Sequence, residues 1–344
     1  MQSQQTMINI FIGLSQYHVD LFENFLLQRT DFQGKSILIT GKEIAFNKEK
    51  WHKHIELSNG VKNQSKSQVS RLKSMTVKLR AYKGVIKHLE KYKSEKRINL
   101  VFSSLEDVLS NYLFFYFSKN IKGLVVEDGV LNYYNHTIRC VPSSVLLLKK
   151  TLTLLFGLNF KFYSGHTSGI NYDKTLFQYV REPSFSVAPN KSKKIPYKPQ
   201  KLELVNSKML IIGQEPYANL DERKYQKHLN LLFEKIKLDE KYMNVKKIMY
   251  KPHRHGPRLK IDTLREYFKE KDFEYVTTDL SAEKYFFEVA QCRNLVTFDS
   301  SAVFNIYSQC DFETRKKLKI SVLPFLDNEL TALFEQLGFY FYKK

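Results

Sequence analysis

Tyr250-Lys251-Pro252-His253-Arg254-His255-Gly256 is the stretch of sequence from which the fold is assigned. The apolar run at 245–250 predicts a strand, and the loop after it holds two histidines, two cations, a proline and a glycine. In an α/β sheet, ligands bind beyond the carboxyl ends of the strands. An imidazole flanked by Lys251 and Arg254 suits an anionic group such as a phosphate. The alternative is a solvent-exposed loop with two surface histidines.

Strands alternate with helical segments on both sides of this stretch. The predicted strands lie at 8–14, 36–40, 99–103 and 123–126 in the first half, and at 208–212, 245–250, 273–277 and 295–298 in the second. Strands separated by helices predict parallel sheets with right-handed crossovers. The predicted fold class is therefore α/β.

A change of composition separates the two halves. Residues 186–199 contain three prolines and four lysines with few apolar side chains, which is typical of a linker. We predict an N-terminal domain at 1–187, a linker at 188–207 and a C-terminal domain at 208–344. A single core rarely exceeds roughly 250–300 residues. We therefore expect two Rossmann-like domains that face each other across a cleft.

The chain is strongly basic, with 55 Lys and Arg against 35 Asp and Glu. A field of this sign favours nucleic acid, an anionic membrane surface, or polyanionic and nucleotide substrates. Residues 62–97 hold twelve Lys and Arg against two Glu, with apolar residues between them, which predicts one or two basic amphipathic helices. The alternative for these helices is a solvated face. The most apolar stretch, 141–160, is interrupted by Lys149 and Lys150, so no membrane-spanning helix is predicted.

The three cysteines, Cys140, Cys292 and Cys310, are far apart and show no metal-binding spacing. They predict neither a disulfide framework nor a zinc site, and they favour a reducing, cytoplasmic compartment. The sequence contains no GxGxxG after the first strand and no GxxxxGK[ST]. The common dinucleotide and P-loop sites are therefore not predicted.

Two adjacent carboxylates follow the strand at 123–126. Glu127-Asp128-Gly129 combines them with a glycine that lets the backbone turn, so that one carboxylate can reach the crevice. Burial or a like-charged neighbour would raise the pKa of that carboxylate and suit it to general-base catalysis. The alternative is a turn in which the acids cap the next element. Ser15 and His18, in the loop after the first strand, are assigned a binding role in the same crevice, and the alternative is a plain βα loop.

A serine pair follows the predicted strand at 295–298. Ser300 and Ser301 precede a predicted helix at 302–307, and hydroxyls and amides at a helix N-terminus can bind phosphate. The alternative is an ordinary N-cap, for which serine is a preferred residue. Glu283, near the start of the preceding helix, either binds a ribose or is a favourable acid in a first helical turn.

These features together resemble the bacterial sialyltransferases and polysialyltransferases that have the GT-B fold. The resemblance rests on the acidic-acidic-Gly motif at 127–129, the Lys-Pro-His motif at 251–253 and the serine pair, which occur in the family's order. Leu210-Ile211-Ile212-Gly213-Gln214 resembles the strand end that opens the family's second domain. Glu283, 17 residues before Ser300, resembles its nucleotide-binding glutamate.

One departure from the family pattern concerns the histidine. In the family this residue is followed by proline, whereas here His253 is followed by Arg254 and then by His255. The choice of the functional histidine therefore stays open between the two. His253 is favoured because it keeps the family's spacing from the strand.

The resemblance implies an inverting transfer of sialic acid from CMP-sialic acid to a sugar hydroxyl of a capsule or lipooligosaccharide. Asp128, or alternatively Glu127, would deprotonate the acceptor, and His253 would stabilise the departing CMP phosphate. The residues implied in CMP binding are Lys251, Gly213, Gln214, Glu283, Ser300 and Ser301, with Gly129, Ser15, His18, Arg254 and His255 as additional candidates. No metal or other cofactor is implied.

The expected partners are the donor, an anionic or lactose-type glycan acceptor, and the inner face of the cytoplasmic membrane, reached by the helices at 62–97. Two other functions stay open. A different GT-B glycosyltransferase of surface polysaccharide synthesis would use another nucleotide sugar, which its preference for UDP over CMP would reveal. A nucleic-acid-binding protein would explain the net charge of +20, but few aromatic residues lie between the cations and no recognised binding motif is present. Nucleic acid is therefore not expected as a partner.

Overall fold

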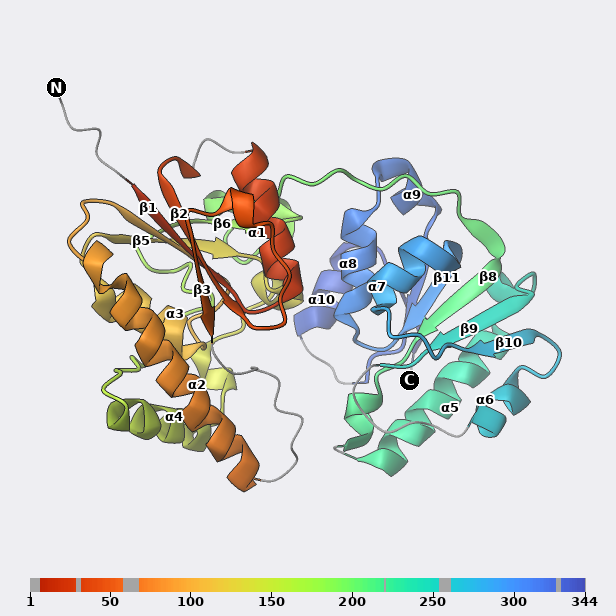
Figure 1. Ribbon diagram of the computed structural model, residues 1–344. Helices are drawn as coiled ribbons and strands as arrows, with labels where there is room; N and C mark the ends of the chain where they lie inside the picture. The colour runs from red at the N-terminus through yellow and green to blue at the C-terminus, as the bar shows by residue number, and fades with distance from the viewer. Residues whose placement is uncertain are drawn as a thin grey trace. The chain divides into compact units, whose positions relative to one another are not determined.

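The computed structural model describes residues 7–28, 32–57, 68–219, 221–253, 261–325 and 329–343. The chain divides into two compact units, Met1–Tyr197 and Lys198–Lys344. Each unit contains one sheet of parallel strands with helices around it (Figure 1). The predicted α/β class with two parallel sheets is therefore confirmed. The predicted cleft between the domains stays a prediction.

The first unit is built on a seven-stranded parallel sheet with the order β3-β2-β1-β4-β5-β6-β7. Its strands are β1 (Ile8–Gly13), β2 (Lys35–Gly41), β3 (Lys53–Leu57), β4 (Ile98–Phe102), β5 (Ile121–Val126), β6 (Thr175–Val180) and β7 (Ser192–Lys194). Its α-helices are α1 (Gln16–Gln28), α2 (Gln68–Leu89), α3 (Val108–Tyr112) and α4 (Ser143–Leu155). The chain leaves β1 toward β2 on one side, and β4 pairs on the other. This reversal of winding is where open α/β sheets bind ligands.

Helices cover both faces of this sheet, because alternate side chains of each strand point to opposite faces. Ile10 and Ile12 of β1 pack in one buried cluster with Tyr82 of α2, whereas Phe11 packs in another with Phe22 of α1. Burial on both faces makes the strands read as continuous apolar runs. These runs are what made β1, β2, β4 and β5 predictable.

The second unit has a six-stranded parallel sheet with the order β10-β9-β8-β11-β12-β13. Its strands are β8 (Val205–Ile212), β9 (Lys247–Lys251), β10 (Asp272–Tyr275), β11 (Cys292–Thr297), β12 (Lys319–Val322) and β13 (Tyr340–Phe341). Its α-helices are α5 (Glu222–Leu238), α6 (Ile261–Tyr267), α7 (Ala282–Tyr285), α8 (Ser301–Gln309), α9 (Phe312–Lys317) and α10 (Glu329–Gln336).

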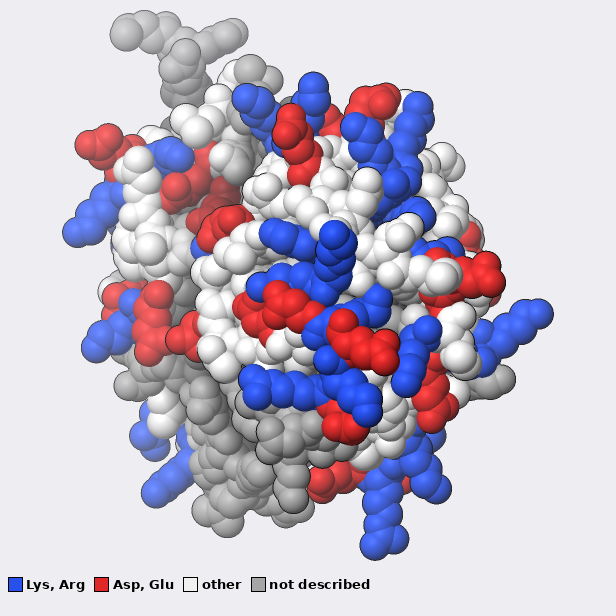
Figure 2. Space-filling model, turned by 90° about the vertical axis from the view of Figure 1, so that its right-hand side faces the viewer, with Lys and Arg blue, Asp and Glu red and all other residues white. Residues whose placement is uncertain are grey.

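On the face drawn in Figure 2, Lys and Arg alternate with Asp and Glu, so no surface of a single sign is seen there.

The linker prediction was too long at both ends. Within 188–207, Ser192–Lys194 forms β7, which pairs with β6, and Val205 already begins β8. Lysines are tolerated in β7 because it is the edge strand of the sheet, where one side lacks a neighbouring strand. The predicted basic helix at 62–97 is present as α2 over Gln68–Leu89, and the part of that prediction at 62–67 lies outside the described residues. Among the described helices, none is both long enough and apolar enough to cross a bilayer.

Candidate functional site

The first group of candidate residues lies at the carboxyl ends of β1 and β5 in the first unit. Only β4 separates these strands in the sheet. Ser15 follows β1, and its Oγ accepts the backbone N–H of His18 at 3.3 Å in the first turn of α1. Gly129 follows the acidic pair with φ +57°, a left-handed conformation that favours glycine, as the turn prediction requires.

Glu127 is completely buried, and its carboxylate is enclosed by donors from three parts of the chain. Oε2 accepts the Tyr133 hydroxyl and, at 2.7 Å, the backbone N–H of Arg181. Oε1 accepts the Tyr17 hydroxyl at 3.3 Å and lies 3.4 Å from Arg181 Nη1. The pKa of Glu127 is raised by burial, and Arg181 and the tyrosine hydroxyls offset this only in part. Because every partner donates, we assign this carboxylate as ionised and as part of the fold.

Asp128 has the opposite environment, since 44% of its side chain is exposed. Its backbone N–H donates to Asn132 Oδ1 at 3.0 Å, which holds the turn in place. Asp128 Oδ1 lies 3.7 Å from His18 Nε2, too far for a hydrogen bond but close enough for electrostatic contact. The structure thus brings together two residues that are 110 positions apart in the sequence, and both were candidates.

His18 is a buried imidazole, with 4% of the residue exposed. In the described part of the chain, neither Nδ1 nor Nε2 has a hydrogen-bond partner. Burial lowers the pKa of His18, and the Asp128 carboxylate opposes this in part. The ring is therefore neutral near pH 7, and one of its nitrogens can accept a proton or a hydrogen bond.

We expect His18 to make the stability of the first unit depend on pH. As pH falls below 6.5, the unfolded chain binds a proton at this histidine, whereas the folded chain binds it only at lower pH. The free energy of unfolding should therefore decrease in this window, and the decrease should be smaller in His18→Gln. Urea unfolding at pH 7.5 and 5.5 checks this, with exposed His88→Gln as the control. Equal pH dependence in all three proteins would contradict the assignment.

The second group of candidate residues lies at the carboxyl ends of β8, β9 and β11 in the second unit. β8 is the central strand of these three, so the segments at 213–215, 252–253 and 299–301 follow adjacent strands. The sheet therefore brings to one edge three motifs that are separated by up to 88 residues in the sequence. Arg254 and His255 lie outside the described residues.

Glu215 is a buried residue that the sequence analysis did not select, and it holds His253 in place. Its Oε2 accepts the backbone N–H of His253 at 2.6 Å, and its Oε1 accepts the Tyr250 hydroxyl at 2.6 Å. A Cβ at Gly213 would lie only 2.5 Å from Glu215 Oε1 and from the Tyr250 hydroxyl. Gly213 is thus required by close packing. Gln214 donates its backbone N–H to the Tyr225 hydroxyl at 3.1 Å.

Lys251 is buried, and its ammonium donates to the carbonyl oxygen of Thr278 at 2.9 Å. This contact joins the end of β9 to the loop after β10. His253 is half-buried, two residues beyond Lys251. Of the two, His253 is the better placed to reach a ligand, because the described contact of Lys251 is directed into the protein.

Ser300 is the N-cap of α8, with its Oγ accepting the backbone N–H of Ala302 at 3.3 Å. Ser301 is the first residue of the helix. Asp299, just before them, is largely buried and accepts the backbone N–H of Phe325 at 2.8 Å. Glu283 accepts Asn305 Nδ2 of α8 at 2.9 Å, which places it beside the same helix as the serine pair.

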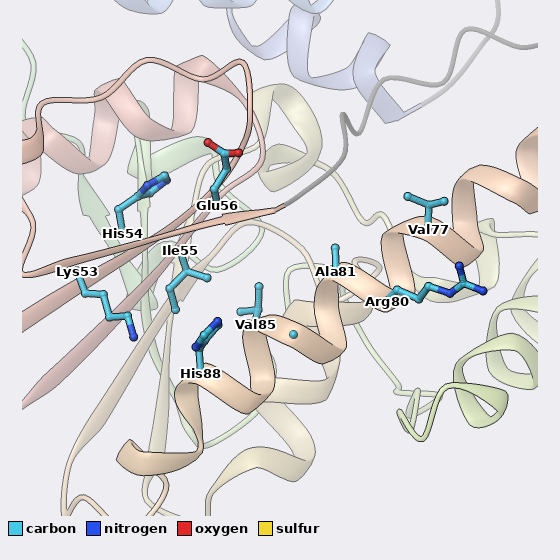
Figure 3. A pocket seen from close by; sticks show the side chains of 10 residues that line it. Lys53, His54, Ile55, Glu56, Val77, Arg80, Ala81, Val85 and His88 are labelled. Carbon is cyan, nitrogen blue, oxygen red and sulfur yellow. The ribbon is translucent and has the colours of Figure 1, made fainter.

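One groove lies apart from these groups. A groove of 480 Å³ lies between β3 and α2, lined by residues that include Lys53, His54, Arg80 and His88 (Figure 3). None of the candidate residues lines it. In the described part of the chain, no three His, Cys, Asp or Glu side chains are grouped as metal ligands would be.

We expect Glu215→Gln to weaken the His253 loop. Glutamine has one oxygen and one N–H₂ group in place of two oxygens. The N–H₂ would face either the Tyr250 hydroxyl or the backbone N–H of His253, both of which donate, so one hydrogen bond is lost and a buried polar group is left unsatisfied. Such a loss costs about 1–3 kcal/mol. The measurement is the free energy of unfolding of the second unit, with Glu222→Gln, at the exposed start of α5, as the control. Unchanged stability in Glu215→Gln would show that Glu215 does not hold this loop.

No protein-family model matches the chain, and no curated protein matches it. Among solved structures, it is similar to the glycotransferase of kitacinnamycin, with a TM-score of 0.49 and 8% identity over 98% of this chain and 86% of that one. It is also similar to the 2,6-sialyltransferase of Vibrionaceae Photobacterium sp. JT-ISH-224, a complex with CMP and lactose, with a TM-score of 0.49 and 12% identity over 98% and 78% of the chains. The GT-B domain of the Photobacterium damselae sialyltransferase gives a TM-score of 0.49 and 13% identity over 98% and 100%. These similarities assign neither an activity nor a substrate to this chain.

Proposed function

We propose that this protein is a GT-B sialyltransferase that transfers sialic acid from CMP-sialic acid to a hydroxyl of a surface glycan. The observation that carries the proposal is the division of roles in the acidic pair. Glu127 is enclosed by donors, whereas Asp128 is partly exposed beside a buried imidazole. Asp128 is therefore our candidate for the general base.

In the proposed reaction, the acceptor oxygen attacks the anomeric carbon of sialic acid and the bond from that carbon to the CMP phosphate oxygen breaks. The acceptor proton passes to the Asp128 carboxylate, and the electron pair of the broken bond goes to the phosphate. Attack from the face opposite the leaving group inverts the configuration. The buried His18 ring, whose Nε2 lies 3.7 Å from Asp128, would help to position that carboxylate.

The second unit would bind the CMP part of the donor. His253 would donate a hydrogen bond or a proton to the departing phosphate, since its backbone is held by Glu215. The Ser300 hydroxyl accepts a bond from Ala302, so its hydrogen stays available to a phosphate oxygen at the start of α8. Glu283, beside the same helix, would bind the ribose. The charge that develops on the leaving phosphate needs stabilisation, which the His253 imidazole and the Ser300 hydroxyl would supply as hydrogen-bond donors.

The test is to incubate the protein with CMP-sialic acid and with lactose or oligosialic acid, and to identify the product by mass spectrometry. Calorimetry compares CMP with UDP as ligands. We expect transfer and a preference for CMP, with both transfer and CMP affinity reduced in His253→Ala but not in the exposed control Lys269→Ala. A preference for UDP, with no transfer from CMP-sialic acid, would instead favour a glycosyltransferase of different donor specificity.

A further inference from the structure

Helix α4 leaves most of its leucines in contact with solvent. Its outward side chains include Leu147, Leu148, Leu154 and Leu155, which are 63%, 50%, 53% and 76% exposed. The two pairs are seven residues apart, or about two helical turns, and therefore lie on one face. Phe162, 44% exposed, follows the helix. We call these five side chains the α4 patch. An apolar patch on a helix that has few buried residues indicates an interaction surface.

The surroundings of the α4 patch are cationic. Lys150 Nζ lies 4.8 Å from the ring centroid of Phe162, and exposed Lys161 is next to that ring in the sequence. A Cβ at Gly157, just after α4, would lie 3.9 Å from Lys83 Nζ, so the basic helix α2 runs close to the end of α4. Figure 1 shows these two helices at the same end of the first unit.

The distribution of charge in the sequence is equally one-sided. Residues 129–172, which include α4, contain no Asp or Glu, and neither does α2 over Gln68–Leu89. Residues 1–197 hold 29 Lys and Arg against 14 Asp and Glu, whereas residues 198–344 hold 26 against 21. Most of the positive net charge therefore belongs to the unit that carries the α4 patch.

We propose that the α4 patch and the cations around it bind the surface of an anionic phospholipid bilayer. The leucines would enter the boundary between headgroups and acyl chains, while Lys83, Lys150 and Lys161 contact anionic headgroups. The flexible stems of the lysines allow their charges to stay at the headgroups while the apolar side chains are buried. Since α4 has only thirteen residues, it lies along the surface and does not span the bilayer.

Two other occupants fit these observations less well. A second copy of the chain, pairing through the same patch, would bring like charges from the two copies together around the leucines. A nucleic acid would bind the lysines but would leave the four leucines exposed to water. An anionic bilayer uses both features of the surface, the apolar face and the positive rim.

The experiment is flotation of the full chain with phosphatidylcholine vesicles, with and without phosphatidylglycerol. We expect binding to the anionic vesicles that weakens at high salt. Leu147→Glu combined with Leu155→Glu should lower the partition coefficient on the order of tenfold or more, because two apolar anchors are lost and two negative charges are added. The matched control is Leu238→Glu, which alters an 80% exposed leucine of the second unit. This variant should bind anionic vesicles as the unchanged protein does.

A second pair, Lys83→Glu with Lys150→Glu, tests the cations and should remove the preference for anionic vesicles. Thermal unfolding and CMP binding should stay unchanged in all variants, so the outcome is independent of the proposed transferase activity. The proposal is overturned if the unchanged protein does not bind anionic vesicles, or if the variant with Leu147→Glu and Leu155→Glu binds them as well as the unchanged protein does. It is also overturned if the protein binds no vesicles and sedimentation velocity shows a dimer that dissociates only in the variant with Leu147→Glu and Leu155→Glu.

Discussion

Asp128→Asn is expected to lower the rate of sialyl transfer about 10²–10⁴-fold, the usual contribution of a general base. Asparagine keeps the shape of the side chain but cannot take a proton from the acceptor hydroxyl. Because 44% of the Asp128 side chain is exposed and its Oδ1 lies 3.7 Å from the neutral ring of His18, little of the fold depends on its charge. The free energy of unfolding should therefore change by no more than about 0.5 kcal/mol.

The measurements are kcat for transfer from CMP-sialic acid and urea unfolding of the same samples. Asp173→Asn is the matched control, since it removes an exposed carboxylate just before β6. This position is at the amino end of its strand, whereas Asp128 follows the carboxyl end of β5. This control should keep full activity. An Asp128→Asn protein with full activity would remove Asp128 from the role of general base.

Glu127→Gln is expected to destabilise the first unit by about 3–5 kcal/mol, the usual effect of removing one partner of a buried ion pair. The substitution removes the negative charge that lies 3.4 Å from the buried guanidinium of Arg181. It also turns an amide N–H₂ toward groups that already donate, the Tyr133 and Tyr17 hydroxyls and the Arg181 backbone. Activity should be lost because the strand end that carries Asp128 is no longer held.

Trp51 makes this measurement specific to the first unit. It is the single tryptophan of the chain, it is largely buried, and its ring packs 5.1 Å from that of Phe11 in the sheet core. Its fluorescence during urea unfolding should therefore follow this unit. Tyr133→Phe, which loses only hydroxyl hydrogen bonds, should cost about 1 kcal/mol or somewhat more. If Glu127→Gln proves no less stable than Tyr133→Phe, the ion pair does not hold this part of the fold.

A double variant separates the ion pair from the hydrogen bonds. Glu127→Gln combined with Arg181→Met removes both charges, so no uncompensated charge stays buried. The double variant should therefore lose less stability than the sum of the two single variants. Strict additivity would indicate that Glu127 and Arg181 do not interact.

Much of the fold was predictable because it depends on local pattern. Continuous apolar runs predicted β1, β4, β8 and β11. β1 and β4 are buried along their whole length, whereas β8 is buried over its last four residues and β11 at every position except Arg293. In contrast, β3 was missed. Its sequence Lys-His-Ile-Glu-Leu contains three polar residues and only two apolar ones, because it is the edge strand beside α2. β7 was taken for linker for a related reason, since an edge strand accepts three polar residues.

The sequence by itself determined which chemical groups follow the strands, among them Asp128 after β5 and His253 after β9, since a parallel sheet places residues after its strands at one edge. Only the tertiary structure decided which of these groups is held in the fold and which is available for chemistry. Glu127 and Asp128 are adjacent acids, yet the first meets Arg181, from the end of β6, and the second meets His18, from α1. The same holds for Glu215, whose partners Tyr250 and His253 come from the next strand. Burial and hydrogen bonding depend on partners distant in sequence, so an isolated carboxylate in the sequence cannot be assigned to the fold or to catalysis.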